Sequence, residues 1–453
     1  MRKRALSFLL AMILTMALLP FEAFAESGLP IDEKAFPDAN FRQYVLDTLD
    51  KDHNTRLSPS EIVAVTWINV SGKEIKDMKG VEHFTALTGL DCGINELTAL
   101  NVSANTELTE LYCYTNKLTS LDVSKNTKLK TLRCQTNQLT KLDLSKNTEL
   151  DYLNFAVNQI SSIDLSKNTK LTSLQCGSNK LTKLDLTKNT ALQAVECTSN
   201  KLTSLDLSHC PDLQLAHVCG NQIKELDLRS CKAFSKALKE TAKVTYYAYN
   251  DACYIANSPY LAVVDYTTAV RIGSGAKPKI TAQPKSVTAA SGKAVTFTVK
   301  ATGKDLTYRW LYLKKGATEY KQRGSKPTLT VKAAAGLNGT KYRCIVRNGD
   351  WIRFTKAAKL KVAEKPRITY QTGNVTAKSG QKVSFKVKAS GTDLKFQWYC
   401  MKPGAKKWVR IAKATKASWT VKASKKVNGY KYRCLVYNEA GKAYSKAARL
   451  TVK

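Results

Sequence analysis

Leucine and asparagine recur at fixed positions through the middle of the chain. From Leu87 the residues follow L-x-x-L-x-C-x-x-N-x-L-x-x-L-D-L-S-x-N-x-x, a pattern of 21 residues repeated seven times with few substitutions. Within each repeat, L-x-C alternates apolar and variable residues, as in a short strand with one buried face. Self-similarity at a fixed period predicts stacked units that bury their apolar faces against one another.

This pattern resembles the bacterial leucine-rich repeat of the nested kind, in which each repeat holds two similar halves, here LKTLRCQTN and LTKLDLSKN. The resemblance implies a mainly β solenoid over residues 87–240. A short amide side chain can satisfy backbone groups at a recurring tight turn, and stacked amides can bond along the ladder. We therefore predict a structural role for the first asparagine of each repeat, at Asn95, Asn116, Asn137, Asn158, Asn179, Asn200 and Asn221.

Cysteine occupies the sixth place of five repeats, and Phe155 and Val218 fill the same place in two others. A position that accepts Cys, Phe or Val is an apolar core position, where free cysteine behaves as a small buried hydrophobe. Disulfides between neighbouring rungs are the alternative, but rungs lie about 4.8 Å apart whereas bridged Cβ atoms prefer about 3.8 Å. We predict buried thiols at Cys92, Cys113, Cys134, Cys176 and Cys197, and regard four cysteines outside this ladder as better disulfide candidates, namely Cys210, Cys219, Cys231 and Cys253.

Outward positions of the strand-bearing face are where repeat proteins usually bind. Here they bring aromatic, basic and amide side chains onto three consecutive repeats, and Tyr and Arg are enriched at binding hot spots. The alternative is an ordinary exposed strand face with a few aromatic residues. The predicted protein-binding surface consists of Tyr112, Tyr114, Arg133, Gln135, Tyr152 and Asn154.

Aspartates form another ladder, at Asp122, Asp143, Asp164, Asp185, Asp206 and Asp227. Stacked carboxylates could bind cations. Lysine follows three residues later in four of these repeats, however, so a solvated and locally neutralised face is favoured.

The N-terminus has the features of a secretory signal peptide at residues 1–25. Basic residues precede the apolar stretch FLLAMILTMALL, and Ala23-Phe24-Ala25 offers small residues for cleavage. No second apolar run approaches the length of a membrane span, and the C-terminus lacks a sorting motif. We therefore expect a secreted, extracellular protein, held at the cell wall, if at all, by non-covalent contacts.

Residues 26–86 contain a stretch with the spacing of an EF-hand loop, which binds calcium through oxygen ligands. Thr55 departs from the pattern, because the sharp turn prefers glycine there, and the sequence holds no second EF-hand. A helical cap that has lost its metal is therefore the alternative to a calcium site. In either case the segment is expected to cover the N-terminal end of the repeats. The candidate ligands are Asp50, Asp52, Asn54, Arg56 through its carbonyl, Ser58 and Glu61.

After a tyrosine-rich C-terminal cap and linker, residues 241–276, two related units follow at 277–363 and 364–453. Their W…Y-x-C order resembles immunoglobulin-like sandwiches. The resemblance implies core tryptophans at Trp310 and Trp398 and tyrosine corners at Tyr342 and Tyr432. Phenylalanine stands where an inter-sheet disulfide needs its first cysteine, so unpaired core thiols are expected at Cys344 and Cys434.

Charge separates these two units from the rest of the chain. They hold 42 Lys and Arg against 6 Asp and Glu, which accounts for the entire net charge of +36. A magnitude of about 2–8 per small domain already suffices for solubility. We therefore expect the tail to bind an anionic cell-wall polymer, with nucleic acid attracted only by charge and without base reading.

Catalysis finds little support in the sequence. The chain has four histidines, and none lies in H-E-x-x-H, G-x-S-x-G or a metal-ligand pair. We therefore predict a non-catalytic protein. The chain resembles exported leucine-rich repeat proteins of Gram-positive bacteria, and this resemblance implies an adhesin or cell-surface interaction protein that binds an extracellular or host protein. The alternative is a secreted enzyme or accessory protein acting on extracellular peptides or glycans.

Overall fold

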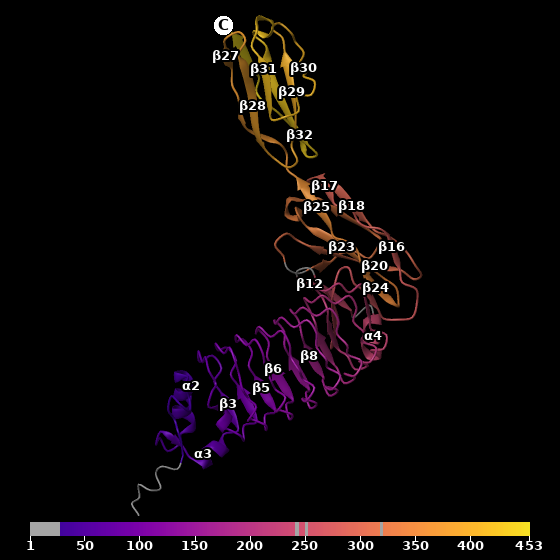
Figure 1. Cartoon of the computed structure of the whole chain (residues 1–453). Coiled ribbons are helices and arrows are strands. Elements are labelled where there is room, and N and C mark those ends of the chain that lie inside the picture. The colour runs from indigo at the N-terminus through magenta and orange to yellow at the C-terminus, as the bar shows by residue number, and fades with distance from the viewer. Residues whose placement is uncertain (1–27, 241–243, 250–251, 318–319) are drawn as a thin grey trace, which may run out of the picture. The chain divides into compact units, whose positions relative to one another are not determined.

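The computed structural model describes residues 28–240, 244–249, 252–317 and 320–453 (Figure 1). The predicted signal peptide lies outside these residues. The fold is mainly β with a small helical N-terminal segment, as predicted. Two compact units divide the chain, one of residues up to 244 with 255–265, the other of residues 245–254 with 266–453.

The first unit begins with a small helical segment. β1 (Leu29–Pro30) pairs antiparallel with β2 (Arg56–Leu57). Between these strands, α2 (Ala39–Tyr44) continues directly into the π-helix η2 (Val45–Leu49). α3 (Pro59–Ala64) begins with a capping box, in which Ser58 and Glu61 each bond to the other's backbone N–H. The 3-10 helix η3 (Val81–His83) follows.

Eight short parallel strands form the sheet of the repeats, and each is in register with the equivalent residues of the next (Figure 1). The middle residue of each strand is buried, as are the ladder cysteines, whose exposure is 0%. The sixth position is therefore a core position, as predicted. The strands are β3 (Trp67–Asn69), β4 (Gly89–Asp91), β5 (Glu110–Tyr112), β6 (Thr131–Arg133), β7 (Tyr152–Asn154), β8 (Ser173–Gln175), β9 (Ala194–Glu196) and β10 (Leu215–His217).

The first asparagine of each repeat bonds one rung to the next, which confirms its structural role. The Nδ2 of Asn116 donates to the carbonyl of Cys92 on the preceding rung (3.0 Å) and to that of Cys113 on its own (3.2 Å). Its Oδ1 accepts the N–H of Leu97 at 3.0 Å. The residue before each of these asparagines turns the chain in the left-handed region, as at Thr115, where φ is +53°.

A second asparagine ladder closes the opposite edge of the repeats. Asn126 is fully buried, and its Nδ2 donates to the carbonyls of Val102 (2.9 Å) and Asn105 (2.8 Å) of the preceding repeat. The sequence pattern contained this asparagine, but we had predicted no role for it. The same place is taken by Asn105, Asn126, Asn147, Asn168 and Asn189, and then by Cys210 and Cys231.

The predicted disulfides are absent among the described thiols. Cys210, Cys219 and Cys231 are free, and nothing is described of the side chain of Cys253. Cys210 and Cys231 instead continue the second ladder, with each Sγ 3.7 Å from a carbonyl oxygen of the preceding repeat. Cys210 and Cys231 are therefore explained as replacements of asparagine at a buried turn, whereas Cys219 stands at the seventh position of its repeat.

The repeats end with β11 (Glu225–Asp227) and α4 (Lys232–Lys239). β14 (Tyr260–Asp265) then pairs parallel with β10, in the register Ala216 to Ala262. A strand therefore covers the C-terminal edge of the sheet within the first unit. The other strands of this part of the sequence are β12 (Thr245–Tyr249), β13 (Ala252–Asn257) and β15 (Ala269–Arg271).

The second unit contains two sandwiches of mainly antiparallel strands, each with one parallel pair, β17 with β25 and β27 with β34 (Figure 1). The first is formed by β16 (Lys279–Ala282), β17 (Val287–Ala290), β18 (Ala294–Thr298), β19 (Lys300–Thr302), β20 (Thr307–Leu313), β21 (Lys321–Gln322), β22 (Thr328–Lys332), η4 (Ala335–Leu337), β23 (Lys341–Arg347), β24 (Trp351–Phe354) and β25 (Ala358–Ala363). The second is formed by β26 (Arg367–Gln371), β27 (Val375–Ala377), β28 (Lys382–Ser390), β29 (Lys395–Met401), β30 (Val409–Arg410), β31 (Ser418–Lys422), η5 (Lys425–Val427), β32 (Lys431–Asn438), β33 (Gly441–Tyr444) and β34 (Ala448–Val452).

The core of the first sandwich contains the predicted tryptophan and thiol, with one difference. Trp310 is fully buried and lies opposite Cys344 across β20 and β23. The ring of Tyr342 stacks on Phe297 at 4.6 Å, while its buried hydroxyl has no hydrogen-bond partner among the residues that the structure describes. The tyrosine-corner prediction was therefore wrong for Tyr342, because its ring is drawn inward by the phenylalanine that replaces the cysteine. Trp398 and Cys434 hold the equivalent places in the second sandwich, where Tyr432 stacks on Phe385.

Candidate functional site

The strand face, defined as the outward third, fifth and seventh positions of the repeats carrying β3 to β10, holds a stack of three side chains. The guanidinium carbon of Arg133 lies 5.1 Å from the ring centre of Tyr112 and 4.9 Å from that of Tyr152. These residues come from β5, β6 and β7, and each strand brings its neighbour within contact distance. Cation–π attraction therefore holds an exposed arginine between two rings.

Glutamate fixes the first ring of this stack. The hydroxyl of Tyr112 donates to Oε2 of Glu110, two residues earlier on the same strand. Burial, followed by this hydrogen bond, raises the pKa of Tyr112 to about 12. The phenol is therefore neutral at all physiological pH values, and its hydroxyl remains a hydrogen-bond donor to Glu110.

Trp67 extends the row beyond Tyr112, although we had not predicted it from the sequence. Its indole lies 6.1 Å from the ring of Tyr112 at an interplanar angle of 71°, an edge-to-face arrangement. Trp67 is 44% exposed, a large value for an aromatic residue. It escaped notice because β3 precedes the first clear repeat, so no leucine pattern marks it as a strand position.

The remaining predicted residues lie apart from the stack. Tyr114 lies over Gly93, two residues after the end of β4, and its hydroxyl is 3.4 Å from the Oγ of Ser71. Asn154 is only 8% exposed and donates to Gln175 at 2.7 Å. It therefore links β7 to β8 and presents little surface to a binding partner. Gln135 is half-buried, and its Oε1 has no hydrogen-bond partner among the described residues. The structure thus gathers three of the six predicted residues and separates the other three.

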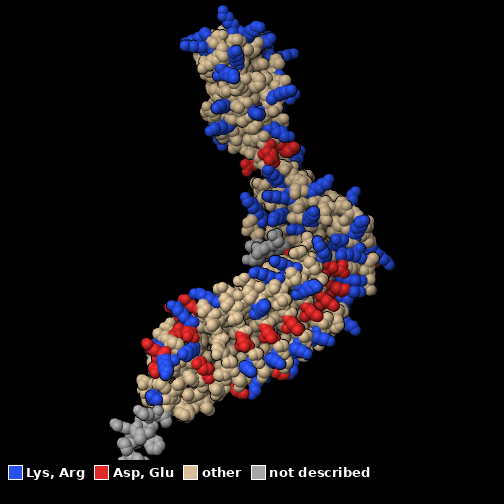
Figure 2. Space-filling model, viewed as in Figure 1, with Lys and Arg blue, Asp and Glu red and all other residues tan. Residues whose placement is uncertain are grey.

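Lysine is absent from the strand face within the described residues. The strand face, from β3 to β10, holds Arg133 as its one Lys or Arg, beside acidic Asp91, Glu110 and Glu196. Elsewhere the repeats are rich in lysine, and Figure 2 shows acidic and basic side chains beside one another over the repeats. The strand face is therefore distinct in composition from the rest of the solenoid surface.

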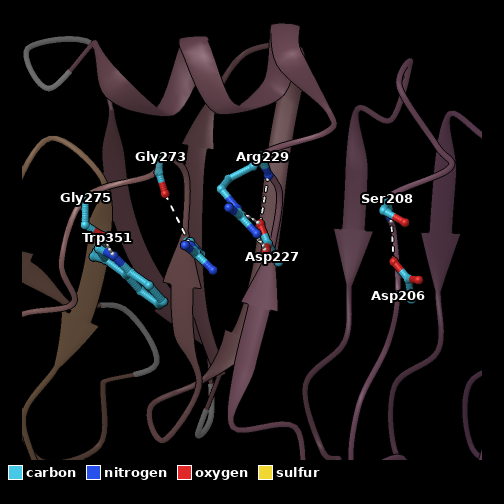
Figure 3. A network of polar contacts seen from close by, with 8 residues as sticks. Asp206, Ser208, Asp227, Arg229, Gly273, Gly275 and Trp351 are labelled. Atoms are coloured by element: carbon cyan, nitrogen blue, oxygen red, sulfur yellow. Dashed lines mark hydrogen bonds and ion pairs between the residues drawn. The ribbon is translucent and has the colours of Figure 1, made fainter.

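The aspartates of this ladder interact mainly with backbone N–H groups of their own turns and less with lysine. In each of these turns, a carboxylate oxygen accepts the N–H of the residue two positions later, as Asp206 does from Ser208 at 2.8 Å (Figure 3). This hydrogen bond is the main cause that lowers the pKa of Asp122, and the charge of Lys125 contributes less. In the last turn Arg229 also pairs with Asp227 at 2.7 Å (Figure 3). Our explanation by lysine neutralisation was therefore incomplete.

The EF-hand-like loop brings three acidic side chains together. One carboxylate oxygen from each of Asp50, Asp52 and Glu61 lies within 4.8 Å of the others. Asp50 is 2% exposed and accepts the N–H of Thr55 at 2.9 Å. Thr55 adopts φ of +66°, the left-handed conformation for which the loop prefers glycine. The chain thus makes the required turn without glycine, and the donor set fits a hard cation.

The other three candidate ligands have partners in the loop. Asn54 accepts the N–H of Arg56 at 2.8 Å, and the guanidinium of Arg56 donates to the carbonyl of Gly28 at 2.7 Å. Ser58 donates its hydroxyl to Glu61 at 2.8 Å. Its hydroxyl therefore orients the carboxylate that ends the loop.

One thiol outside the cysteine ladder lies beside a histidine. Sγ of Cys219 is 3.3 Å from Nε2 of His217, whose Nδ1 lies 3.7 Å from Glu196. Burial and then the charge of Asp265 raise the pKa of Cys219 to about 11, while burial lowers the pKa of His217. Both groups are therefore neutral near pH 7, and a protonated thiol is a poor nucleophile.

Comparisons with known proteins agree with the observed architecture. Residues 277–348 match the immunoglobulin domain model and residues 366–452 match the immunoglobulin I-set domain model. Together with the repeats, these matches define a leucine-rich repeat protein with C-terminal immunoglobulin-like domains. Among the described residues, no helix has the length and apolarity needed to cross a membrane.

Two curated proteins share parts of the sequence. Internalin J of Listeria monocytogenes is 44% identical over 71 residues, which are 16% of this chain and 8% of that protein. Endoglucanase C of Cellulomonas fimi is 29% identical over 178 residues, which are 39% of this chain and 16% of that protein. The chain thus spans a small part of the length of either relative.

Solved structures of internalins are also similar. The functional domain of Internalin J from Listeria monocytogenes, described as including a cysteine ladder, gives a TM-score of 0.44 at 41% identity and covers 46% of this chain and 47% of that one. Internalin C2 of the same organism gives 0.41 at 25% identity, covering 44% and 90%.

Proposed function

We propose that this chain is an extracellular, non-catalytic binding protein, in the manner of an adhesin, that recognises a protein partner with its strand face. The observation that carries the proposal is the stack of Arg133 between Tyr112 and Tyr152. Side chains already held in place lose little conformational entropy when a partner binds. Tyrosine and arginine are also the residues that most often dominate protein interfaces.

The composition of the strand face supports the same function. Lysine is depleted at protein interfaces whereas aromatic residues and arginine are enriched. The strand face has this composition in a chain that otherwise carries a large excess of lysine. The similarity to internalins is a further reason to expect a protein ligand.

Replacing the four predicted contact residues tests this function. The protein and its variant are compared for capture of extracellular host proteins, and the affinity of any captured partner is then measured. Substitution of Tyr112, Tyr114, Arg133 and Tyr152 by serine is expected to weaken binding by several kcal/mol. The control variant replaces four exposed residues outside the strand face, the ion-paired Glu96, Lys117, Glu107 and Lys128. Equal binding by both variants, with folding intact, would reject the strand face.

The basic C-terminal domains suit retention on an anionic cell-wall polymer. Figure 2 shows Lys and Arg spread over the surface of these domains with few acidic side chains among them. Strands such as β28 alternate exposed lysine with buried apolar residues, so each lysine of that strand faces solvent. A field of this strength attracts polyanions at long range.

Salt dependence tests the retention. Binding of the full-length protein to isolated cell walls is expected to fall steeply between low salt and several hundred millimolar, because charges are screened beyond about 10 Å at 0.1 M salt. A variant ending at residue 276 is expected in the medium. If this truncated protein binds the cell wall as well as the full-length protein does, the basic domains are not responsible for retention.

Enzymatic action on extracellular peptides or glycans is the alternative function, and the local similarity to an endoglucanase is the observation that favours it. Cys219 and His217 supply the sole thiol–imidazole contact that the described residues form. Assays of the purified protein on peptide and glucan substrates decide between the two functions. Turnover that disappears in a Cys219→Ser variant would establish catalysis.

Calcium binding by the EF-hand-like loop is a second proposal, and it concerns stability. Asp50, Asp52 and Glu61 would supply carboxylate oxygens, with the side chain of Asn54 and the carbonyl of Arg56 as further ligands. Calcium would offset the repulsion among the three carboxylates and fix the loop between α2 and α3. The expected effect is therefore greater stability of the N-terminal cap.

A further inference from the structure

Asp91 is the one outward side chain of strand β4, and a glycine stands two residues before it and another two residues after it, beyond the end of the strand. A Cβ built on Gly89 would lie 1.8 Å from an atom of the Trp67 indole, and one on Gly93 would lie 2.6 Å from the ring of Tyr114. Both rings therefore lie close to the backbone, that of Trp67 at Gly89 and that of Tyr114 at Gly93, two residues before and after Asp91. Glycine at these two positions is what allows this close approach.

Tyr112 closes a third side. It lies opposite Asp91 in the register of β4 and β5, and its ring meets Trp67 edge to face at 6.1 Å. The hydrogen bond to Glu110 fixes its orientation. Asp91 thus lies at the base of a site bordered by three aromatic rings, which we call the Asp91 site (Trp67, Asp91, Tyr112 and Tyr114).

The carboxylate of Asp91 carries a charge that the described residues do not pair. Its Oδ1 accepts the N–H of Gly93 at 3.0 Å, and the carboxylate forms no ion pair with any residue that the structure describes. Arg133, the nearest cation of the strand face, is stacked between Tyr112 and Tyr152 instead. The Asp91 site therefore combines an unpaired negative charge with aromatic surfaces, both of which attract cations.

We propose that the Asp91 site receives an arginine side chain of the protein partner. A guanidinium is planar, weakly hydrated and stacks on aromatic faces, and it can form two parallel hydrogen bonds with a carboxylate. Arg133 already shows that this face accommodates a guanidinium between rings. The inference rests on the proposed protein-binding function and names the side chain of the partner that reaches the centre of the face.

A small probe tests the site without knowledge of the partner. The full-length protein, labelled with 15N, is titrated with N-acetyl-arginine amide, and the indole N–H signal of Trp67 is followed after assignment with the Trp67→Phe variant. We expect a saturable shift. N-acetyl-citrulline amide, which has the same shape but no charge, should give none, and N-acetyl-lysine amide should bind more weakly.

Two matched variants separate charge from folding. Asp91→Asn should weaken the probe about tenfold, as loss of a charge-assisted contact does. This variant should fold, because Asn69 and Asn154 occupy the same position on their strands and make the same bond to the residue two later. Asp122→Asn is the control, since Asp122 makes an equivalent bond to Ser124 on another face and has no ring contact.

Three results would overturn the inference. They are an unchanged affinity in Asp91→Asn, equal binding of the citrulline probe, and equal binding of the lysine probe. In any of these cases the proposed function still stands if the four serine substitutions abolish partner binding. Conversely, the protein could bind the arginine probe but capture no partner. This result would support a guanidinium site at Asp91 and reject protein recognition by the strand face.

Discussion

Trp67 occupies the space that a side chain on Gly89 would fill: the Cζ3 atom of the indole lies 1.8 Å from the position of a Cβ on that glycine. The two residues pair directly across β3 and β4. Gly89 is buried as a consequence, although it stands on the outward side of the sheet. Because Gly89 has no side chain, the indole of Trp67 on β3 can pack directly against the backbone of β4.

Substitution of Gly89 by alanine should displace this indole. The φ of Gly89 lies outside the left-handed region, so the effect is steric, and an exposed ring can swing into solvent at a cost below about 1 kcal/mol of stability. We expect a red shift of tryptophan emission and weaker binding of the arginine probe. Ser173→Ala, at the equivalent position of β8, is the control. An unchanged spectrum would show that Trp67 does not rest on this glycine.

Loss of an amide from the second asparagine ladder should be costly. Asn168 is fully buried and donates to the carbonyls of Leu144 (3.1 Å) and Asn147 (2.8 Å). In Asn168→Ala each carbonyl keeps one backbone N–H partner but loses the side-chain hydrogen bond that joins the two repeats. The expected destabilisation is about 2–3 kcal/mol, measured by denaturant unfolding. Asn168→Cys should cost less, because Cys210 and Cys231 occupy equivalent sites. The ladder would lack energetic importance if the alanine variant matched the exposed control Asp164→Ala.

Relief of backbone strain should stabilise one turn. Val157 has φ of +55° and is 50% exposed, so its side chain gains little contact while its backbone adopts a conformation that β-branched residues disfavour. Val157→Gly should therefore raise the free energy of unfolding by about 1 kcal/mol. Gly220 already holds the equivalent place in the last repeat, with φ of +73°. Val157→Ala keeps the strain and should give no comparable gain.

Buried thiols should make the repeats sensitive to alkali. Burial raises the pKa of Cys134 to about 12, whereas an unfolded thiol ionises near pH 8.5. The unfolded state therefore loses a proton that the folded state keeps, and stability is complete below about pH 8.5 and falls as the pH rises towards 12. At pH 10 the loss for this thiol is about 2 kcal/mol. Cys134→Val should reduce the loss between pH 8 and pH 10, and an identical loss in that variant would contradict the mechanism.

The same thiols should be protected from reagents. Alkylation of the native protein should spare the ladder cysteines, and alkylation after denaturation without reductant should label all five of them, as mass spectrometry would reveal. Cys113→Val should be tolerated, since Val218 fills the equivalent place. Recovery of rung-to-rung disulfides would refute the interpretation of these positions as apolar core.

Calcium should raise the thermal stability of the N-terminal cap. A ligand that binds the folded state alone at 100 times its dissociation constant stabilises it by about 2.7 kcal/mol. The gain should disappear with a chelator and in an Asp50→Asn, Glu61→Gln variant. Magnesium, which tolerates such flexible loops poorly, is the control ion. No change in melting temperature on adding calcium would favour a cap that has lost its metal.

The sequence predicted the repeats well because a period of 21 residues fixes which side chains face inward, and one fixed register then follows for every strand. It predicted Tyr112, Arg133 and Tyr152 on one face for the same reason. Trp67 and the covering of Gly89 could not be found in this way. They depend on which direction a ring turns over a neighbouring backbone, and periodicity contains no information about that direction.

The two asparagine ladders have a consequence for how the solenoid changes in length. From Asn116 onward, each Nδ2 of the first ladder donates to a carbonyl 24 residues earlier, and each Oδ1 accepts from a residue 19 earlier. Removal or insertion of 21 consecutive residues therefore joins every amide to an equivalent partner, whereas a change of one residue leaves both ladders mismatched downstream. The gene can lengthen or shorten this protein by whole repeats, and a binding face can be moved along it, without new contacts having to evolve.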